Sequence, residues 1–264
     1  MKPAPKGVAS FPVHAFDGRH FSRTEVPLIQ ETSLAVFLNG RPLATIACTG
    51  LHLDELALGY LKSEGLITDA SDIRDMRINP EAVAVHLLTA ADAASGPTDA
   101  PFRGNIASSG ARSRSGSGRH RLPAPLTQDV LRLSPEQVLQ LMDTFIDLCR
   151  LHAETRGTHG AALTDGKEIL VLREDIGRHN AIDMLAGYAL LNHWDCSDKA
   201  VLRTGRVSTE IIYKLWNLGV PVIVSLAAPT ARAVELAAEA GMTLIGAIRG
   251  RSMQVYTHER RIGL

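Results

Sequence analysis

A short apolar strand, a polar turn and a helix follow one another three times in the C-terminal half of the chain. The clearest copy is Ile169–Gly187 (ILVLREDIGRHNAIDMLAG), in which aliphatic residues give way to charged and amide side chains and then to helical spacing. Similar copies occupy residues 199–219 and 220–241. Strands that alternate with helices in this way are typical of an α/β fold, which the sequence therefore predicts.

The polar turns after these strands are the candidate binding site. If the strands are parallel, the turns converge at one edge of the sheet, where unpaired N–H groups at helix N-termini attract anions. A solvated, capped helix would explain each turn alone, so the convergence is what favours binding. Four arginines in or near the turns suit phosphate oxygens, namely Arg178, Arg206, Arg249 and Arg251. The residues alone thus predict an anion-binding cleft.

Ahead of this region the sequence predicts an arm and a smaller α+β subdomain. Residues 1–24 contain several prolines and no periodicity, which favours an arm that is loosely ordered or docked as an edge. From residue 25, alternating residues around Asn39-Gly40 predict a hairpin, because both turn residues tolerate positive φ. A helix ending near Gly65 and two short strands follow. We expect this subdomain to occupy residues 25–125 and the main core to occupy residues 126–264.

Residues 90 to about 125 are rich in Ser, Gly, Ala, Pro and Arg and nearly lack large apolar side chains. Such a segment buries too little surface to offset its ordering entropy, so a mobile loop is expected. Its arginines, between Arg103 and Arg121, suit phosphate, although a solvated linker also explains them. The helix that follows is capped by Ser134, and Cys149 falls on its apolar stripe, which indicates a core residue rather than a reactive one.

Charge and cysteine content argue against several classes of protein. Lys plus Arg and Asp plus Glu number 28 each, so no net field favours nucleic acid as a partner. No run approaches the roughly 20 apolar residues of a membrane span, and the N-terminus lacks a secretory signal, so we expect no membrane partner and a cytoplasmic location. Three widely spaced cysteines (Cys48, Cys149 and Cys196) fit neither a disulfide framework nor a structural zinc site.

Common catalytic and phosphate-binding motifs do not account for the candidate site. The chain contains neither GxxxxGK[ST] nor GxGxxG, and the P-C-x-x-C motif of zinc deaminases does not occur. His159 and His179 are open to two interpretations, as hydrogen-bonded structural residues or as the proton carriers of an unrecognised hydrolase. Nothing in the sequence positions a nucleophile beside either histidine.

Several blocks of sequence resemble the formate dehydrogenase accessory protein family, FdhD. They are ETSLAVFLNG, DELALGYLKSEGLI, GTHGAAL, REDIGRHNAIDMLAG, LRTGRVSTEIIYKLWNLGVPVIVSLAAPTARAVELA and LIGAIRGRSMQVYTH, in this order from about residue 25 to the C-terminus. The resemblance implies a cytidine-deaminase-like α/β core and a cytoplasmic, homodimeric sulfur carrier. Such a carrier accepts sulfur from a cysteine desulfurase as a persulfide and passes it to the molybdenum cofactor before the cofactor enters formate dehydrogenase.

The resemblance also implies a ligand for the polar turns. It is the guanine dinucleotide form of the molybdenum cofactor (bis-molybdopterin guanine dinucleotide), bound as cargo and mimicked by GDP. The segment from Ala247 to Ser252 corresponds to the family's cofactor-binding segment. The residues implied in cofactor binding are Thr158, His159, Gly177, Arg178, His179, Asn180, Thr204, Gly205, Arg206, Ser208, Pro229, Thr230, Ala247, Ile248, Arg249, Gly250, Arg251 and Ser252.

The chain departs from the family pattern at the position that carries sulfur. The family's Cys-Gly-x-Cys-Gly motif falls on residues 109–113, so Ser109 stands at the catalytic persulfide position and Arg112 at the second cysteine. A hydroxyl cannot form the S–S bond of a persulfide. Two hypotheses follow: a sulfur carrier that uses another thiol, for which Cys48 is a candidate, or a cofactor chaperone or nucleotide-binding module without sulfur transfer.

Overall fold

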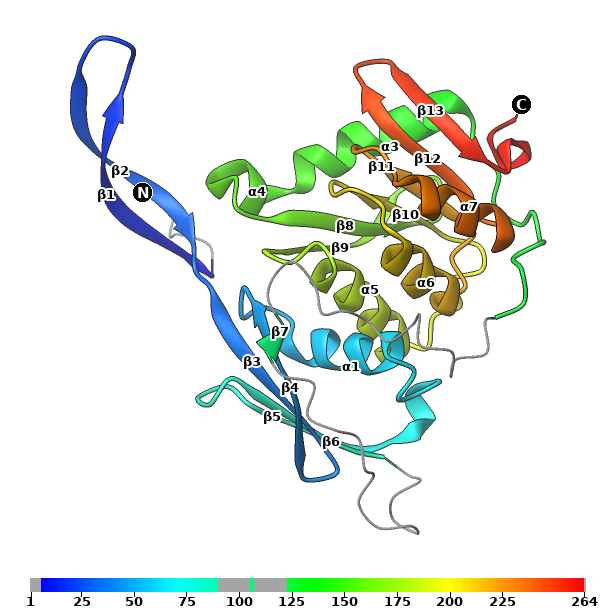
Figure 1. Ribbon diagram of the computed structural model, residues 1–264, viewed down its shortest axis with the longest axis horizontal. Helices are drawn as coiled ribbons and strands as arrows, with labels where there is room; N and C mark the ends of the chain where they lie inside the picture. Colours follow the sequence, from blue (N-terminus) through cyan, green and yellow to red (C-terminus); the bar gives the residue numbers. More distant parts are fainter. Residues whose placement is uncertain (1–5, 90–104, 107–122, 264) are drawn as a thin grey trace.

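The computed structural model describes residues 6–89, 105–106 and 123–263. Its largest sheet has six strands in the order β13-β12-β11-β10-β8-β9, with helices on both faces (Figure 1). The strands are β8 (His159–Thr164), β9 (Ile169–Asp175), β10 (Ala200–Arg203), β11 (Val222–Ser225), β12 (Thr243–Arg249) and β13 (Ser252–Thr257). The helices are α3 (Pro135–Leu148), α4 (Arg150–Thr155), α5 (Asn180–Leu191), α6 (Thr209–Leu218) and α7 (Ala231–Glu239), with a 3-10 turn at Glu259–Ile262. The predicted α/β fold is confirmed, whereas the cytidine-deaminase-like assignment stays a prediction.

The polar turns do converge, although the strands before them are not all neighbours. β10, β11 and β12 are parallel, while β8 lies between β9 and β10 and is antiparallel to both. Two successive reversals restore the direction, so β9 points the same way as β10. The turn after β9 therefore lies at the same edge as the turns after β10 and β11.

Each face of this sheet has its own apolar core. Val201, Ile223 and Leu244 pack with α5, α6 and α7 on one face, and Leu202 and Val224 pack with α3 on the other. Short parallel strands covered on both faces are apolar throughout, which is why the sequence shows continuous aliphatic runs. None of the helices within the described ranges is long and apolar enough to cross a membrane.

A second sheet of five strands, in the order β5-β6-β3-β4-β7, holds the N-terminal subdomain. Its elements are β3 (Thr32–Leu38), β4 (Arg41–Cys48), α1 (Leu53–Ser63), the 3-10 turn Ala70–Asp72, β5 (Ile73–Asn79), β6 (Ala84–Thr89) and β7 (Asn105–Ile106). The predicted hairpin at Asn39-Gly40, the helix and the two strands after it are confirmed. The Ser134 cap is confirmed as well.

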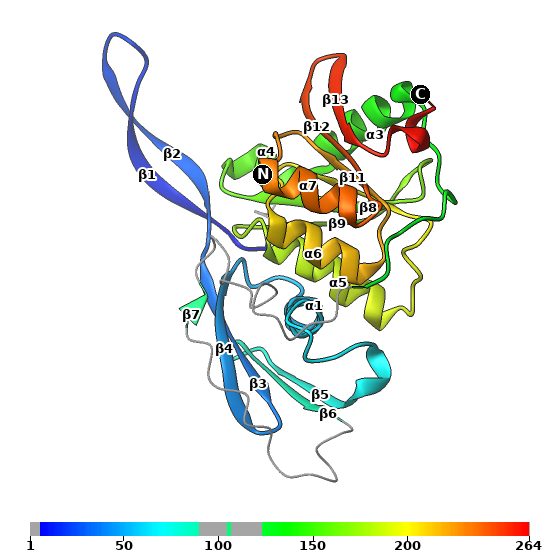
Figure 2. The ribbon, with the colours of Figure 1, turned by 45° about the vertical axis from the view of Figure 1, so that its right-hand side comes forward.

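The two sheets are joined by a close contact between α1 and α5 (Figure 2). A Cβ atom at Gly59 would lie 1.7 Å from the carbonyl oxygen of Asp183, and one at Gly187 would lie 1.9 Å from that of Glu55. Only glycine allows the two helix backbones to approach so closely. Polar groups line this junction, where Lys214 Nζ lies 2.6 Å from both carboxylate oxygens of Asp183 and Ser63 Oγ donates to the same carboxylate.

A second part of the junction binds the start of α5 to β4. Asp175 accepts hydrogen bonds from the backbone and side chain of Thr49 and from the backbone N–H of Gly177. Asn180 donates both to Asp175 and to the carbonyl of Ala47. We call these two networks together the junction, and every polar side chain just named has a protein partner.

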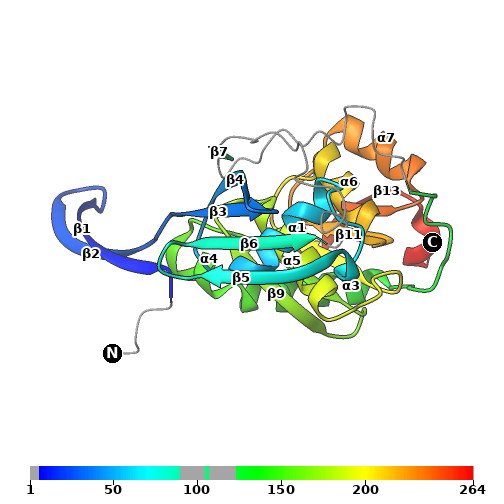
Figure 3. The same ribbon diagram turned by 90° about the horizontal axis from the view of Figure 1, so that it is seen from below.

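The N-terminal arm differs from its prediction. Residues 8–29 form an antiparallel hairpin of β1 (Val8–Phe16) and β2 (Phe21–Ile29) that projects from the body of the protein (Figures 1 and 3). The predicted boundary at residues 24 and 25 falls inside β2. Pro12 and Pro27 suppressed the strand signal in the sequence, because proline is depleted in strands except where an edge is free, as it is here.

Candidate functional site

Four of the predicted site residues meet where β8, β9 and β10 come together. Thr204 N donates to Gly160 O at 3.1 Å, and Thr204 Oγ1 lies 3.5 Å from Nδ1 of His159, the first residue of β8. Gly205 lies between them and Arg178: an added Cβ there would lie 3.3 Å from Arg178 Cβ and 3.4 Å from His159 Nδ1. The predicted convergence of the first two turns is thus a direct contact.

The most unusual group at this edge is Arg203, the last residue of β10. Its side chain is 1% exposed, and no carboxylate within the described ranges forms an ion pair with it. Nε donates to Gly205 O at 3.0 Å, whereas Nη1 has no hydrogen-bond partner in the part of the chain that the structure describes. Burial, and then the nearby charge of Arg178, lowers the pKa of Arg203 to about 9. A buried cation without a counterion favours a bound anion.

His179, the residue before α5, adds a second unpaired group. The side chain is buried, and Nδ1 has no partner. Nε2 lies 3.0 Å from Glu210 Oε2, without the alignment of a hydrogen bond. Burial, and then the positive charge of Lys214, lowers the pKa of His179 to about 3. Burial also lowers the pKa of His159, so both imidazoles favour the neutral form at this edge.

Ser208 is the N-cap residue of α6, but its hydroxyl makes no capping hydrogen bond. Its Oγ is buried and has no hydrogen-bond partner among the described residues. Arg178 Nε is also buried and unpaired. We call Arg178, His179, Arg203 and Ser208 the turn cluster. Buried donors normally have partners, so their shared lack of one indicates space for an acceptor-rich ligand.

Three predicted residues serve the fold at this edge. Thr158 donates to Glu174 at 3.2 Å, and Glu174 also accepts the backbone N–H groups that open α4. Asn180 uses both amide hydrogens in the junction, and a Cβ at Gly177 would lie 2.7 Å from the Asn180 side chain. These side chains position the turn, while their predicted contact with a ligand is not tested by the structure.

The remaining predicted residues lie on the turns after β11 and β12. Thr230 caps α7 by accepting from Ala233 N, and its own N–H donates to Val207 O, which links this turn to the one after β10. Arg249 Nη1 donates to the carbonyl of Leu226. Pro229 lies beside Gly246, and Ala247, whose φ is 52°, lies with Ile248 at a bulge of β12. Gly250 and Arg251 form the turn between β12 and β13, and Ser252 begins β13. Arg206, Arg249 and Arg251 are exposed, so they lie at the rim and not in the turn cluster.

Sequence reasoning missed Arg203 and assigned its role to Arg206. A signal was available, because the strands β10 and β11 each end in a polar residue, and Arg203 pairs in register with Ser225. Ser225 Oγ donates to Gly205 O, the same carbonyl that accepts from Arg203. Polar residues that end neighbouring buried strands in register mark the carboxyl edge of a sheet.

The chain's three cysteines all lie within the described residues and are buried and free. Burial raises the pKa of Cys48 to about 11 and those of Cys149 and Cys196 to about 12. The predicted core position of Cys149 is confirmed. Ser109, Arg112 and the predicted mobile loop lie outside the described residues. Within the described residues no group of three or more His, Cys, Asp or Glu is placed to hold a metal ion.

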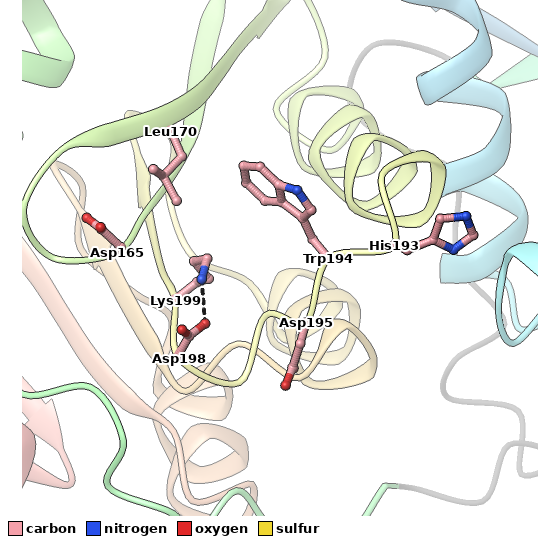
Figure 4. A pocket seen from close by; sticks show the side chains of 7 residues that line it. All are labelled: Asp165, Leu170, His193, Trp194, Asp195, Asp198 and Lys199. Atoms are coloured by element: carbon pink, nitrogen blue, oxygen red, sulfur yellow. Dashed lines mark hydrogen bonds and ion pairs between the residues drawn. The ribbon is translucent and has the colours of Figure 1, made fainter.

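A cavity of about 540 Å³ lies at the opposite edge of the sheet (Figure 4). Its acids are engaged: Asp165 accepts two backbone N–H groups, Asp195 accepts from Ser197, and Asp198 pairs with Lys199. None of the predicted site residues lines it. The turn cluster is therefore the better candidate site.

Comparisons with known proteins agree on one family. A family model described as the FdhD/NarQ family matches residues 29–263. The sulfur carrier protein FdhD of Geobacillus kaustophilus is 36% identical over 257 residues, and that of Bacillus subtilis is 34% identical over 261, each comparison covering 95% of both chains. A crystal structure described as a formate dehydrogenase accessory protein from Desulfotalea psychrophila has a TM-score of 0.78 at 22% identity. It covers 97% of this chain and 99% of that one, which supports the fold.

Proposed function

This chain belongs to the FdhD/NarQ family, and from that premise we propose that it is a maturation factor of formate dehydrogenase that binds the molybdenum cofactor in its guanine dinucleotide form. We place this cofactor-binding function in the cytoplasm. The single observation that carries the proposal is the turn cluster. Arg203 is a buried guanidinium with no ion pair among the described residues, and Arg178, His179 and Ser208 at the same edge of the sheet each have a buried polar atom without a hydrogen-bond partner there. A dinucleotide supplies the phosphate oxygens that such donors favour.

The geometry supports a binding role. Arg203 and Arg178 supply the positive charge, the Ser208 hydroxyl supplies a neutral donor, and the exposed Arg206 extends the charge to the rim. The Thr204 hydroxyl lies 3.5 Å from His159 Nδ1, but it also accepts the backbone N–H of Gly160, which is a structural role beside β8. A nucleophile activated by a histidine needs a shorter contact and a group that orients the base, so the geometry favours binding over hydrolysis. The cluster is suited to hold an anionic cargo while another protein acts on it.

The relatives named above are sulfur carriers, and two routes for sulfur fit this chain. In the first, a cysteine desulfurase supplies sulfur directly to the cofactor bound here, and this chain acts as a binding-only chaperone. In the second, the chain carries a persulfide itself. Cys48 is the candidate thiol for the second route, and it ends β4, the strand that pairs with β7. Its burial and raised pKa disfavour the thiolate, so we propose the first route.

Nucleotide binding tests the core of the proposal. GDP binds only the native state, so at about 100 times its dissociation constant it should stabilise the protein by about 2.7 kcal/mol. The Arg203→Met variant should lose most of the resulting rise in melting temperature. Arg232→Met, which removes an exposed arginine paired with Glu235 on α7, is the matched control and should keep it. An unshifted melting curve for the wild type at millimolar GDP would contradict the proposal.

Measuring the intact mass of the protein distinguishes the two routes for sulfur. The protein is incubated with a cysteine desulfurase and cysteine, and its intact mass is then measured without reductant. The binding-only route predicts no added sulfur atom. A sulfur adduct that disappears in Cys48→Ser but persists in Cys196→Ser would establish the persulfide route instead.

A further inference from the structure

A carboxylate lies beside the donors of the turn cluster, where a ligand made only of phosphate would disfavour it. Glu210 is the second residue of α6, and its Oε2 lies 3.0 Å from Nε2 of His179. The Glu210 side chain is 31% exposed, and no lysine or arginine of the described ranges forms an ion pair with it. A carboxylate repels phosphate oxygens, so its presence at this edge needs a reason beyond phosphate binding.

Helix spacing places Glu210 in the outer of two contacts between α5 and α6. Residues four apart lie on one face of a helix, which aligns Glu210 with Lys214 on α6. His179, just before α5, is aligned with Asp183 in the same way. The inner contact is a complete ion pair, because Lys214 Nζ lies 2.6 Å from both carboxylate oxygens of Asp183. The outer contact lacks the alignment of a hydrogen bond, so Glu210 keeps its acceptor capacity at the carboxyl edge.

His179 does not neutralise this carboxylate. Burial, and then the charge of Lys214, lowers the pKa of His179 to about 3, so the imidazole is neutral near pH 7. A neutral imidazole has one donor nitrogen and one acceptor nitrogen, and neither has a hydrogen-bond partner within the described ranges. The carboxylate therefore remains charged and without a counterion, next to the arginines of the turn cluster.

The helix dipole offers a second explanation for Glu210. Negative charge in the first turn stabilises a helix, and Glu210 is the acidic residue in the first turn of α6. The dipole requires only the charge and not a contact with His179. The two explanations differ in their consequences, because an effect of the dipole changes the stability of α6, whereas a contact with a ligand changes which ligand binds.

The combination of donors and a carboxylate acceptor selects among ligands that contain phosphate. Guanine has adjacent N–H donors, at N1 and at the 2-amino group, and the two oxygens of a carboxylate can accept from both. Adenine has an acceptor at N1, so the same carboxylate would meet a lone pair. A site that pairs with N–H groups rejects analogues that lack them, because its own polar group is then left unpaired.

We propose that Glu210 is a specificity-determining residue, which accepts hydrogen bonds from the adjacent N–H groups of a 2-amino-4-oxopyrimidine edge while Arg178 and Arg203 hold phosphate. The assignment rests on the nucleotide binding proposed above. Guanine and pterins share this edge. Guanine is the source that the arginines favour, because a guanine nucleotide carries the phosphates that they bind and a free pterin carries none.

The base preference of the wild type is measured by isothermal titration calorimetry at pH 7. IDP, which lacks the 2-amino group, should bind about 10-fold more weakly than GDP, and ADP about 100-fold more weakly, because each hydrogen bond to a charged group contributes about a factor of 10 or more. Neopterin, a pterin without phosphate, should not displace GDP. Displacement of GDP by neopterin would overturn the choice of guanine and assign the edge to a pterin.

The Glu210→Gln variant separates recognition of the base from recognition of phosphate. It should bind GDP about 10-fold more weakly, because the amide nitrogen opposes a guanine donor. It should bind inorganic pyrophosphate at least as tightly as the wild type, because a negative charge is removed. XDP has a carbonyl oxygen in place of the amino group, so the amide can pair with it, and XDP should bind the variant more tightly than the wild type.

Glu235→Gln is the matched control. It makes the same change of charge at an exposed position of α7 and should match the wild type with every ligand. Weaker binding of pyrophosphate by Glu210→Gln would indicate a structural role and overturn the assignment. Equal affinities of the wild type for GDP and ADP would overturn the assignment alone, whereas a wild type that binds neither nucleotide nor pyrophosphate would also overturn the nucleotide binding on which it rests.

Discussion

The junction and the turn cluster are both buried and polar, but they differ in how their groups are paired. At the junction, the Asp183 carboxylate meets Lys214 and Ser63, and Asp175 accepts hydrogen bonds from three residues. In the turn cluster, Arg203, His179 and Ser208 each retain an atom without a partner. Buried polar groups that are all hydrogen-bonded to one another hold two parts of a protein together. Buried polar groups that lack partners can instead gain hydrogen bonds when a ligand binds.

The largest expected effect is at the junction. Asp183→Ala should lower the free energy of unfolding by about 3–5 kcal/mol, because it leaves the buried Lys214 charge without its partner. Urea denaturation measures this loss. Asp198→Ala, which breaks the more exposed pair with Lys199, is the control and should cost less than about 1 kcal/mol. Equal costs for the two variants would mean that the junction does not hold the subdomains together.

The next effect is a dependence of stability on pH through His179. The pKa of His179 is about 3 in the folded protein, well below the ordinary 6.5 of a histidine, so below pH 6.5 the unfolded state binds more protons. Stability is therefore present above pH 6.5 and is lost as the pH falls toward 3, by about 2–4 kcal/mol from this residue. His179→Asn should flatten the decrease seen in denaturation curves across that window. An unchanged slope would show that His179 is solvated.

Removing charge from the turn cluster should change the free energy of unfolding in the opposite direction. Arg203→Met should leave the free energy of unfolding unchanged or raise it by about 1–4 kcal/mol in buffer without phosphate, because an uncompensated buried cation is lost. Gly205 O keeps its hydrogen bond from Ser225, so no acceptor is orphaned. A destabilised variant would indicate that Arg203 has a structural partner, and the contrast with the junction would then fail.

The smallest effect compares two residues at the same helical position. Thr230→Ala should cost about 1 kcal/mol, because Thr230 caps α7, whereas Ser208→Ala should cost less than about 0.5 kcal/mol, because Ser208 caps nothing. Ser208→Ala should instead weaken the stabilisation by GDP. Thermal denaturation with and without GDP measures both quantities. A similar stability cost for the two variants would show that the Ser208 hydroxyl is satisfied.

Local signals in the sequence predicted most of the secondary structure. The Asn39-Gly40 turn and the Ser134 cap each depend on a few neighbouring residues, and each was found as expected. The β1–β2 hairpin was missed, because Pro12 and Pro27 lower strand propensity and the register that pairs the strands is a non-local property. The order of strands in the main sheet was likewise beyond reach.

The convergence of the polar turns could be predicted from the sequence, but the burial and pairing of individual side chains in them could not. The turns converge as expected, but the sequence could not show that Arg203 points into the protein while Arg206 is exposed. It also could not show that the amide of Asn180 is used by Asp175 and Ala47. The burial of a side chain and its hydrogen-bond partners depend on which strands become neighbours, and a sequence motif alone does not give the order of the strands.

The pair Gly59 and Gly187 has a mechanical consequence. Helices whose backbones touch cannot slide or tilt without collision, so α1 and α5 leave no hinge between the two sheets. Closure of one subdomain upon the other is therefore not a way to admit or release a large cargo. In the described part of the chain, α1, α5 and the two sheets that they join thus form a fixed frame that carries the turns of the carboxyl edge.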